Sequence, residues 1–230
     1  MSDSSLKDIL LPQSNLTPDL ARRDPNTFKK VLLMKVQQNP RMAPIFNGLE
    51  SIDRISKEQI VLQETWTSEA TGDSQRIKLG FHEIPQQIQD SIFYTASSGY
   101  PRGYEQQLVY RFTHEVTHKY FDLLAFEAQH PKVMELFSLA AQARLDGDVG
   151  FTSFGHIDNQ GRQIKQANED VTELLNMYIW NPQYLRDYLD LLANPHAEQL
   201  RNQHNLVSLD AESKTHIFQL VESIITSPNS

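Results

Sequence analysis

The stretch from residue 105 to residue 129 constrains the fold most strongly, because it has helical spacing and contains a His-Glu-x-x-His run at 114–118. His114 and His118 are four residues apart, so their rings lie one above the other on a single helix face. Both rings can then reach one ion without any bend in the backbone. Glu115 lies beside the first histidine and off their common axis. The run therefore predicts a helix that presents two imidazoles to one metal ion.

Zinc is the metal that this spacing favours, because tetrahedral zinc sites are built from imidazole and carboxylate ligands. Glu115 would point toward a water on the metal and could take its proton as a general base. The alternative is a coincidence of two histidines and a glutamate on a polar helix face, which is expected about 0.02 times in a chain of this composition. The run is suggestive by itself, and a third ligand is needed to decide between these alternatives.

Composition narrows the ligand types and the classes of partner. The 230 residues contain no cysteine, so a metal must be held by His, Asp or Glu. A net charge of −8 without clustered Lys and Arg argues against a nucleic-acid partner. We find neither an apolar stretch near the roughly 18 residues of a membrane span nor a cleavable signal. We therefore expect a soluble protein, cytoplasmic or exported by a route that needs no cleavable signal in this sequence, and composition does not indicate its oligomeric state.

The first part of the chain has a polar lead-in followed by β patterning. Residues 1–24 are polar and punctuated by proline, which predicts a flexible lead-in or, alternatively, a pro-segment. Period-two spacing then predicts strands at 60–67 and 76–81, paired as a hairpin, and a third strand at 91–96.

The remaining pattern predicts an α+β fold with one domain over residues 25–230. Residues 25–130 should contain a small mixed sheet of about three strands packed on the 105–129 helix. Residues 131–230 have helical spacing broken by proline and glycine, which predicts a mainly helical part that carries the third zinc ligand.

That third ligand is needed because a catalytic zinc site uses three protein ligands and one open position. Glu169 and Glu173 lie one turn apart on a later predicted helix. Glu169 could bind the metal, Glu173 could accept a hydrogen bond from a ligand histidine, and Asn168 could cap or orient. Alone, two acidic residues near a helix start indicate a solvated face. Together with the histidine pair, they predict a three-ligand site of His114, His118 and Glu169.

The two runs together resemble those of the gluzincins, thermolysin-like zinc metallopeptidases with His-Glu-x-x-His on one helix and Asn-Glu-x-x-x-Asp or a similar run on a following helix. The first run matches in full at 114–118, and Asn168 and Glu169 match the start of the second. Glu173 stands where the family often has Asp, which keeps the charge and lengthens the side chain. The resemblance covers about residues 91–180.

The resemblance implies a zincin-like fold and a zinc-dependent peptidase, an endopeptidase, that uses one zinc ion to hydrolyse a peptide or protein substrate. Glu115 would activate the zinc-bound water and then protonate the leaving amine. An edge strand before the active-site helix would bind the substrate backbone, and residues 92–96 are the candidate. His156 is the first candidate for stabilising the oxyanion, with Tyr184 and Arg186 as others.

Two other interpretations remain open: a catalytically inactive zincin-fold binding module, and a metal-free helical interaction protein. The intact Glu115 favours the enzyme over the inactive module, because a metal site without catalysis does not need it. Metal content after purification without added zinc separates the metal-free protein from the other two. A metzincin is excluded, since it would need Gly at 121 and His at 124 where this chain has Phe121 and Leu124.

Overall fold

The computed structural model describes residues 15–70, 76–85, 100–147, 149–152 and 163–227. The main elements, in chain order, are α1 (Pro18–Arg23), α2 (Pro25–Gln37), α3 (Met42–Ser51), β1 (Ile60–Gln63), β2 (Glu69–Ala70), β3 (Ile77–Gly80), α5 (Tyr104–Asp122), α6 (Pro131–Gly147), α7 (Gln163–Trp180), α8 (Pro182–Ala193), α9 (Glu198–Gln203) and α10 (Ala211–Thr226). The fold is α+β and mostly helical, as predicted. Within these ranges, no helix is both long and apolar enough to cross a membrane.

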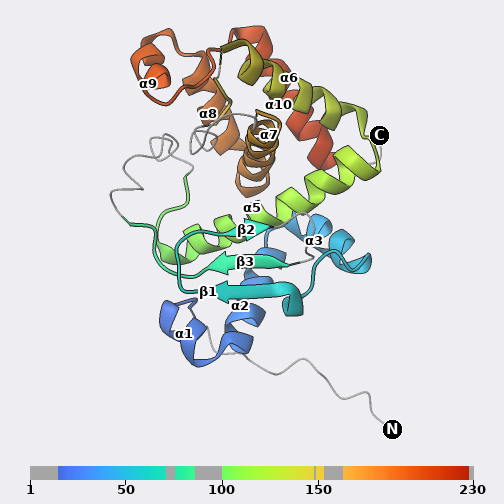
Figure 1. Cartoon of the computed structure of the whole chain (residues 1–230), viewed down its shortest axis with the longest axis vertical. Coiled ribbons are helices and arrows are strands. Elements are labelled where there is room, and N and C mark those ends of the chain that lie inside the picture. The colour runs from blue at the N-terminus through green and yellow to red at the C-terminus, as the bar shows by residue number, and fades with distance from the viewer. Residues whose placement is uncertain (1–14, 71–75, 86–99, 148, 153–162, 228–230) are drawn as a thin grey trace.

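Helix α5 runs between two layers of the molecule (Figure 1). The sheet and helices α2 and α3 pack on one side of it. Helix α7 packs on the other side, and α6, α8 and α10 pack in turn around α7. A side chain on α5 can therefore face either the sheet or α7, depending on its position around the helix.

The sheet is small and mixed, with three strands in the order β1-β3-β2. β1 runs parallel to β3, with Ile60 opposite Ile77, whereas β2 runs antiparallel to β3, with Ala70 also opposite Ile77. The prediction of a hairpin between β1 and β3 is wrong, because the chain between them forms β2 on the far edge of β3 and so returns in the parallel direction. A strand of two residues is too short to show period-two patterning. The third strand predicted at 91–96 lies outside the described residues.

The described end of the lead-in, residues 15–24, packs on the body of the protein, unlike the flexible segment expected there. Thr17 caps α1 and Asp24 caps α2, each by accepting a backbone N–H with its side chain. Leu16 is buried, and its N–H donates to Glu105 in the first turn of α5 at 3.0 Å. One isolated apolar residue among polar ones has no periodicity, so sequence patterning could not detect this contact.

The helical run that begins with α5 extends close to residue 129, as predicted, but its regular α-helical part ends at Asp122. A π-helical turn follows at Leu123–Glu127, where the N–H of Ala128 donates to the carbonyl of Leu123 at 2.9 Å. Gln129 then adopts a positive φ of 49°, which ends the helical run. The histidines lie in the regular part, where the four-residue spacing keeps both rings on one face.

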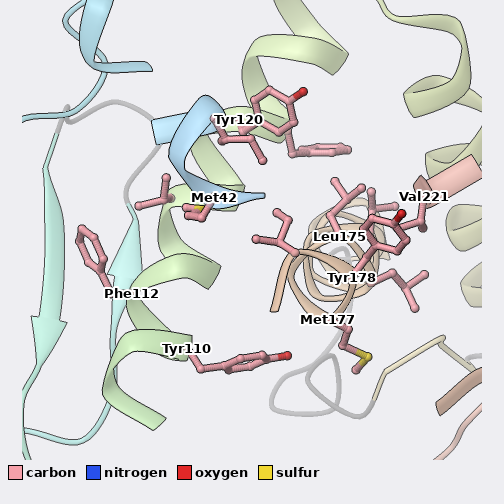
Figure 2. Close-up of a cluster of buried hydrophobic side chains, with 14 of the residues drawn as sticks. Met42, Tyr110, Phe112, Tyr120, Leu175, Met177, Tyr178 and Val221 are labelled. Atoms are coloured by element: carbon pink, nitrogen blue, oxygen red, sulfur yellow. The ribbon is translucent and has the colours of Figure 1, made fainter. Parts of the chain in front are cut away.

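One apolar cluster extends across both layers and surrounds the contact between α5 and α7 (Figure 2). It includes Met42 of α3, Phe112 of α5, Leu175 of α7 and Val221 of α10, all buried. The fully buried polar side chains at the α5 and α7 contact, such as Glu173 and Asn176, are therefore removed from bulk water, and each needs a partner.

Candidate metal centre

Polar side chains form a row where α5 and α7 face each other. Tyr110 contacts Glu173 near one end, and His118 contacts Asn168 near the other, so the later part of α5 meets the earlier part of α7. On α5, the row consists of Tyr110, His114 and His118, which are spaced four residues apart and so lie on one helix face. Such a row inside an apolar core is expensive to bury and calls for a functional explanation.

Three donor atoms converge at the centre of this row. The Nε2 atoms of His114 and His118 are 3.1 Å apart, and Oε2 of Glu169 lies 3.2 Å from Nε2 of His118 and 3.4 Å from Nε2 of His114. These three residues form a group that could hold a metal ion. The structure thus brings together all three ligands predicted from the sequence.

The triangle has the size that tetrahedral zinc requires. Ligands about 2.05 Å from a tetrahedral ion lie about 3.3 Å from one another, which agrees with the measured separations of 3.1 to 3.4 Å. The side chains are 12%, 14% and 28% exposed for His114, His118 and Glu169, respectively. The three side chains are therefore partly accessible, so water can reach the group.

The other nitrogen of His114 is held by a buried carboxylate. Nδ1 of His114 lies 2.7 Å from Oε2 of Glu173, whose side chain is fully buried. The second oxygen of Glu173 accepts a hydrogen bond from the hydroxyl of Tyr110 at 2.5 Å. Glu173 therefore supports a ligand ring, as the sequence predicts for this position, and Tyr110 is an additional member that sequence reasoning missed.

The other nitrogen of His118 is held by neutral acceptors. Its Nδ1 lies 3.2 Å from Oδ1 of Asn168 and 3.1 Å from Oγ1 of Thr172. Asp122, one turn beyond His118, accepts a hydrogen bond from the side chain of Asn168. Since that bond uses the amide N–H, it turns the amide oxygen toward His118. The predicted orienting role of Asn168 thus has a geometric basis, whereas Thr172 and Asp122 were not foreseen.

These partners indicate which nitrogen of each ring faces the triangle. The oxygens of Glu173 and Asn168 act as acceptors, so the rings donate from Nδ1, an assignment made from the hydrogen-bond partners. A neutral ring then carries its lone pair on Nε2. The lone pairs of His114 and His118 and the carboxylate of Glu169 face one another at 3.1 to 3.4 Å. Three such acceptors repel unless a metal cation or a shared proton lies between them.

Burial and nearby charges shift the pKa values in this cluster. Burial raises the pKa of Glu115, and His114 and His118 oppose this only in part. Burial also acts to raise the pKa of Glu169, but hydrogen bonds from both histidines outweigh it and hold the pKa below its usual value. Burial acts to lower the pKa of His114, but Glu169 and Glu173 outweigh it and hold the pKa well above its usual value. The carboxylates thus favour positive charge at the centre.

Glu115 occupies a different face of α5, toward the sheet. It is 6% exposed, and its carboxylate accepts a hydrogen bond from the backbone N–H of Ala70. Ala70 belongs to β2, the edge strand that packs against α5. The loop before β2 is fixed by Arg111, which donates to the carbonyl oxygens of Trp66 and His82. The predicted general base therefore contacts an edge strand, on a face of α5 other than the one that carries His114 and His118.

Helix α7 is anchored beside Glu169 by a buried ion pair. Nε and Nη2 of Arg144 on α6 bind the two carboxylate oxygens of Asp170 at 2.9 and 2.8 Å. Thr152 adds its backbone N–H and its hydroxyl to the same carboxylate at 2.8 and 2.7 Å. Gly150 makes room for this pair, because a Cβ there would overlap the guanidinium. This ion pair fixes the position of α7 at Asp170, the residue that directly follows Glu169.

Of the other sequence candidates, the structure describes Tyr184 and Arg186, and neither is one of the three residues of the triangle. His156 lies outside the described residues. Tyr184 is fully buried and packs its ring near that of Tyr110, with centroids 6.3 Å apart. The guanidinium of Arg186 lies 4.3 Å from the ring centroid of Phe218 on α10, away from α5. A residue that stabilises an oxyanion is therefore not identified by these contacts.

Comparisons of the chain with protein-family models, curated proteins and solved structures found no match. The resemblance to gluzincins consequently stays a prediction from two short runs.

Proposed function

We propose that this protein is a zinc-dependent peptidase with a zincin-like fold, which hydrolyses peptide bonds in a peptide or protein substrate. The observation that carries the proposal is the convergence of His114, His118 and Glu169 in a triangle of tetrahedral size, with Glu115 on the same helix. An inactive binding module would need the triangle but not Glu115, which is buried at a cost that catalysis would explain.

Zinc is the metal that best suits these ligands. Two imidazoles and one carboxylate make a common catalytic zinc set, and the chain has no thiolate to favour copper or an iron–sulfur cluster. When bound, zinc would supply a Lewis acid that polarises a carbonyl and lowers the pKa of water. His114, His118 and Glu169 would hold it, while Glu173 and Asn168 would keep the two rings oriented.

Glu115 would perform the proton transfers. It would accept a proton from the attacking water and then deliver that proton to the leaving amine, so one carboxyl group acts as base and as acid. Burial raises its pKa, which strengthens it as a base. The backbone N–H of Ala70 would hold the carboxylate in a fixed orientation.

The edge of β2 would bind the substrate backbone. Among the described residues, Glu69–Ala70 pairs with β3 on one side and with no strand on the other. An extended peptide could add there as a further strand, next to Glu115. Residues 92–96, the segment predicted for this role from the sequence, lie outside the described residues.

The test is metal content together with hydrolysis. Protein purified without added zinc should contain one zinc per chain and cleave an unstructured protein substrate. Glu115→Gln should keep the zinc and lose cleavage by several orders of magnitude, because the amide has the shape of the carboxylate but cannot accept the proton. Glu212→Gln, an exposed glutamate in the first turn of α10, should cleave like the wild type.

Each failure identifies an alternative. Undiminished cleavage by Glu115→Gln rejects the mechanism. Stoichiometric zinc without cleavage of any substrate supports the inactive zincin-fold binding module. A wild-type chain that binds no zinc supports the metal-free interaction protein.

A further inference from the structure

The row between α5 and α7 extends one turn beyond the first histidine. Tyr110 precedes His114 by four residues on the same helix face, and its hydroxyl donates to Oε1 of Glu173 at 2.5 Å. The other oxygen of Glu173 lies 2.7 Å from Nδ1 of His114. A continuous chain of hydrogen bonds thus leads from a tyrosine hydroxyl to a metal-ligand ring.

Glu173 needs this second contact because of its length and burial. A glutamate has one more rotatable bond than an aspartate, so a single hydrogen bond to His114 would leave its carboxylate free to rotate. The side chain is fully buried, and an unpaired oxygen there would carry a large desolvation cost. The hydroxyl of Tyr110 binds the remaining oxygen, so the carboxylate can no longer rotate freely and neither of its oxygens is left unpaired.

The ring of Tyr110 is itself fixed by aromatic neighbours. Its centroid lies 5.7 Å from that of Trp180, 6.3 Å from that of Tyr184 and 6.4 Å from that of Tyr100. In Figure 2 the ring extends from α5 toward α7. The hydroxyl is therefore held in place before any metal binds.

We propose that Tyr110 is a positioning residue for the metal centre, which orients His114 through Glu173. This inference rests on the proposed function, since it needs the histidines to bind zinc. Tyr110 contacts neither metal nor substrate, so its effect must pass through the carboxylate.

The experiment measures zinc affinity of the full chain by competition with a chromophoric chelator. Tyr110→Phe keeps the packed ring and removes the hydroxyl. We expect it to weaken zinc binding about tenfold, the lower end of the range for outer partners of ligand histidines. Tyr178→Phe is the control, because Tyr178 is also buried and donates its hydroxyl to a glutamate, Glu222, at 3.1 Å on the far side of α7. It should change zinc affinity less than twofold.

A double-mutant cycle separates positioning from general destabilisation. If Tyr110 acts through Glu173, Tyr110→Phe should cause no further loss of affinity in a Glu173→Gln background. The visible spectrum of cobalt-substituted protein should also change for Tyr110→Phe and not for Tyr178→Phe. Glu173→Asp provides a second variant, since the shorter arm cannot reach both partners and should weaken zinc binding to a similar degree.

The inference alone is overturned if wild-type protein binds zinc and either Tyr110→Phe or Glu173→Asp binds it equally well. An undiminished effect of Tyr110→Phe in the Glu173→Gln background overturns it too. A wild-type chain that binds no zinc overturns the proposed function and this inference together.

Discussion

At the scale of single residues, the two histidines are supported unequally. His114 donates to the charged carboxylate of Glu173, whereas His118 donates to the neutral oxygens of Asn168 and Thr172. Hydrogen bonds to an ionised acceptor are about twice as strong as neutral ones. His114 should therefore be the more basic and more firmly oriented ligand.

This asymmetry predicts an order of effects among the supporting residues. Glu173→Gln should weaken zinc binding by about 10 to 100-fold without removing a ligand, and Asn168→Ala should weaken it less. Chelator competition measures both affinities, and chemical unfolding of the metal-free variants shows whether the fold is intact. The reverse order, or unchanged affinity in Glu173→Gln, would contradict this account of the ring contacts.

The ligands themselves give a sharper prediction. His118→Ala should lose stoichiometric zinc, because only one imidazole and one carboxylate would remain. Elemental analysis of the purified variant measures the loss. His196→Ala, at an exposed position, is the control and should keep a full equivalent. If His118→Ala also keeps a full equivalent, the ligand assignment is wrong.

At the scale of elements, the centre depends on how α7 is held against α6. The ion pair of Arg144 and Asp170 is fully buried and has four hydrogen bonds to the carboxylate, two of them from Thr152. Removing one partner of such a pair is strongly destabilising. Because Asp170 follows Glu169 directly, a shift of this pair would also move the third ligand.

Gly150→Ala tests this anchor. The added Cβ would overlap the guanidinium of Arg144 and displace it from Asp170, so we expect a loss of about 3 kcal/mol in the free energy of unfolding. Gly48→Ala is a matched control, since a Cβ at Gly48 in α3 meets nothing within 4 Å. It should be neutral or stabilise by about 0.5 to 1 kcal/mol. Equal stability of both variants, measured by urea unfolding, would refute the role of the anchor.

The elements also explain which site residues could be predicted from the sequence. His114 and His118 are four residues apart, as are Glu169 and Glu173, so local spacing was sufficient to predict that each pair shares one helix face. Tyr110 obeys the same period, but a tyrosine on a buried face is ordinary core packing until α7 is known to lie opposite. The parallel pairing of β1 and β3 likewise depended on β2, a strand too short to have a pattern. Local sequence patterns could not predict these two features, because both depend on contacts between segments far apart in the chain.

At the scale of the whole molecule, α5 contacts both of the layers between which it runs. Its histidines His114 and His118 face α7, while Glu115 faces β2. A bound ion would connect α5 to α7 by a cross-link that is absent from the unfolded chain. Metal binding should therefore stabilise the contact between the layers.

Zinc should raise the melting temperature of the metal-free protein. Free zinc at one hundred times its Kd adds about 2.7 kcal/mol if it binds only the folded chain. Each kcal/mol raises Tm by about 2 to 4 °C in a chain of this size, so the expected increase is about 5 to 10 °C. Calorimetry with and without a chelator measures it. His118→Ala should show no increase, and an equal shift in that variant would indicate binding elsewhere.

The separation of the ligands along the chain has a consequence for biosynthesis. His114 and His118 emerge from the ribosome well before Glu169, because all of α6 lies between them. A nascent chain that ends within α6 offers two imidazoles and no carboxylate partner on α7, which makes it a poor competitor for scarce metal. If the chain binds zinc as proposed, capture by all three residues must therefore wait until α7 has been made. Until then, the carboxylates of α7 cannot meet the rings, so a wrong ion would find only two of the three proposed ligands.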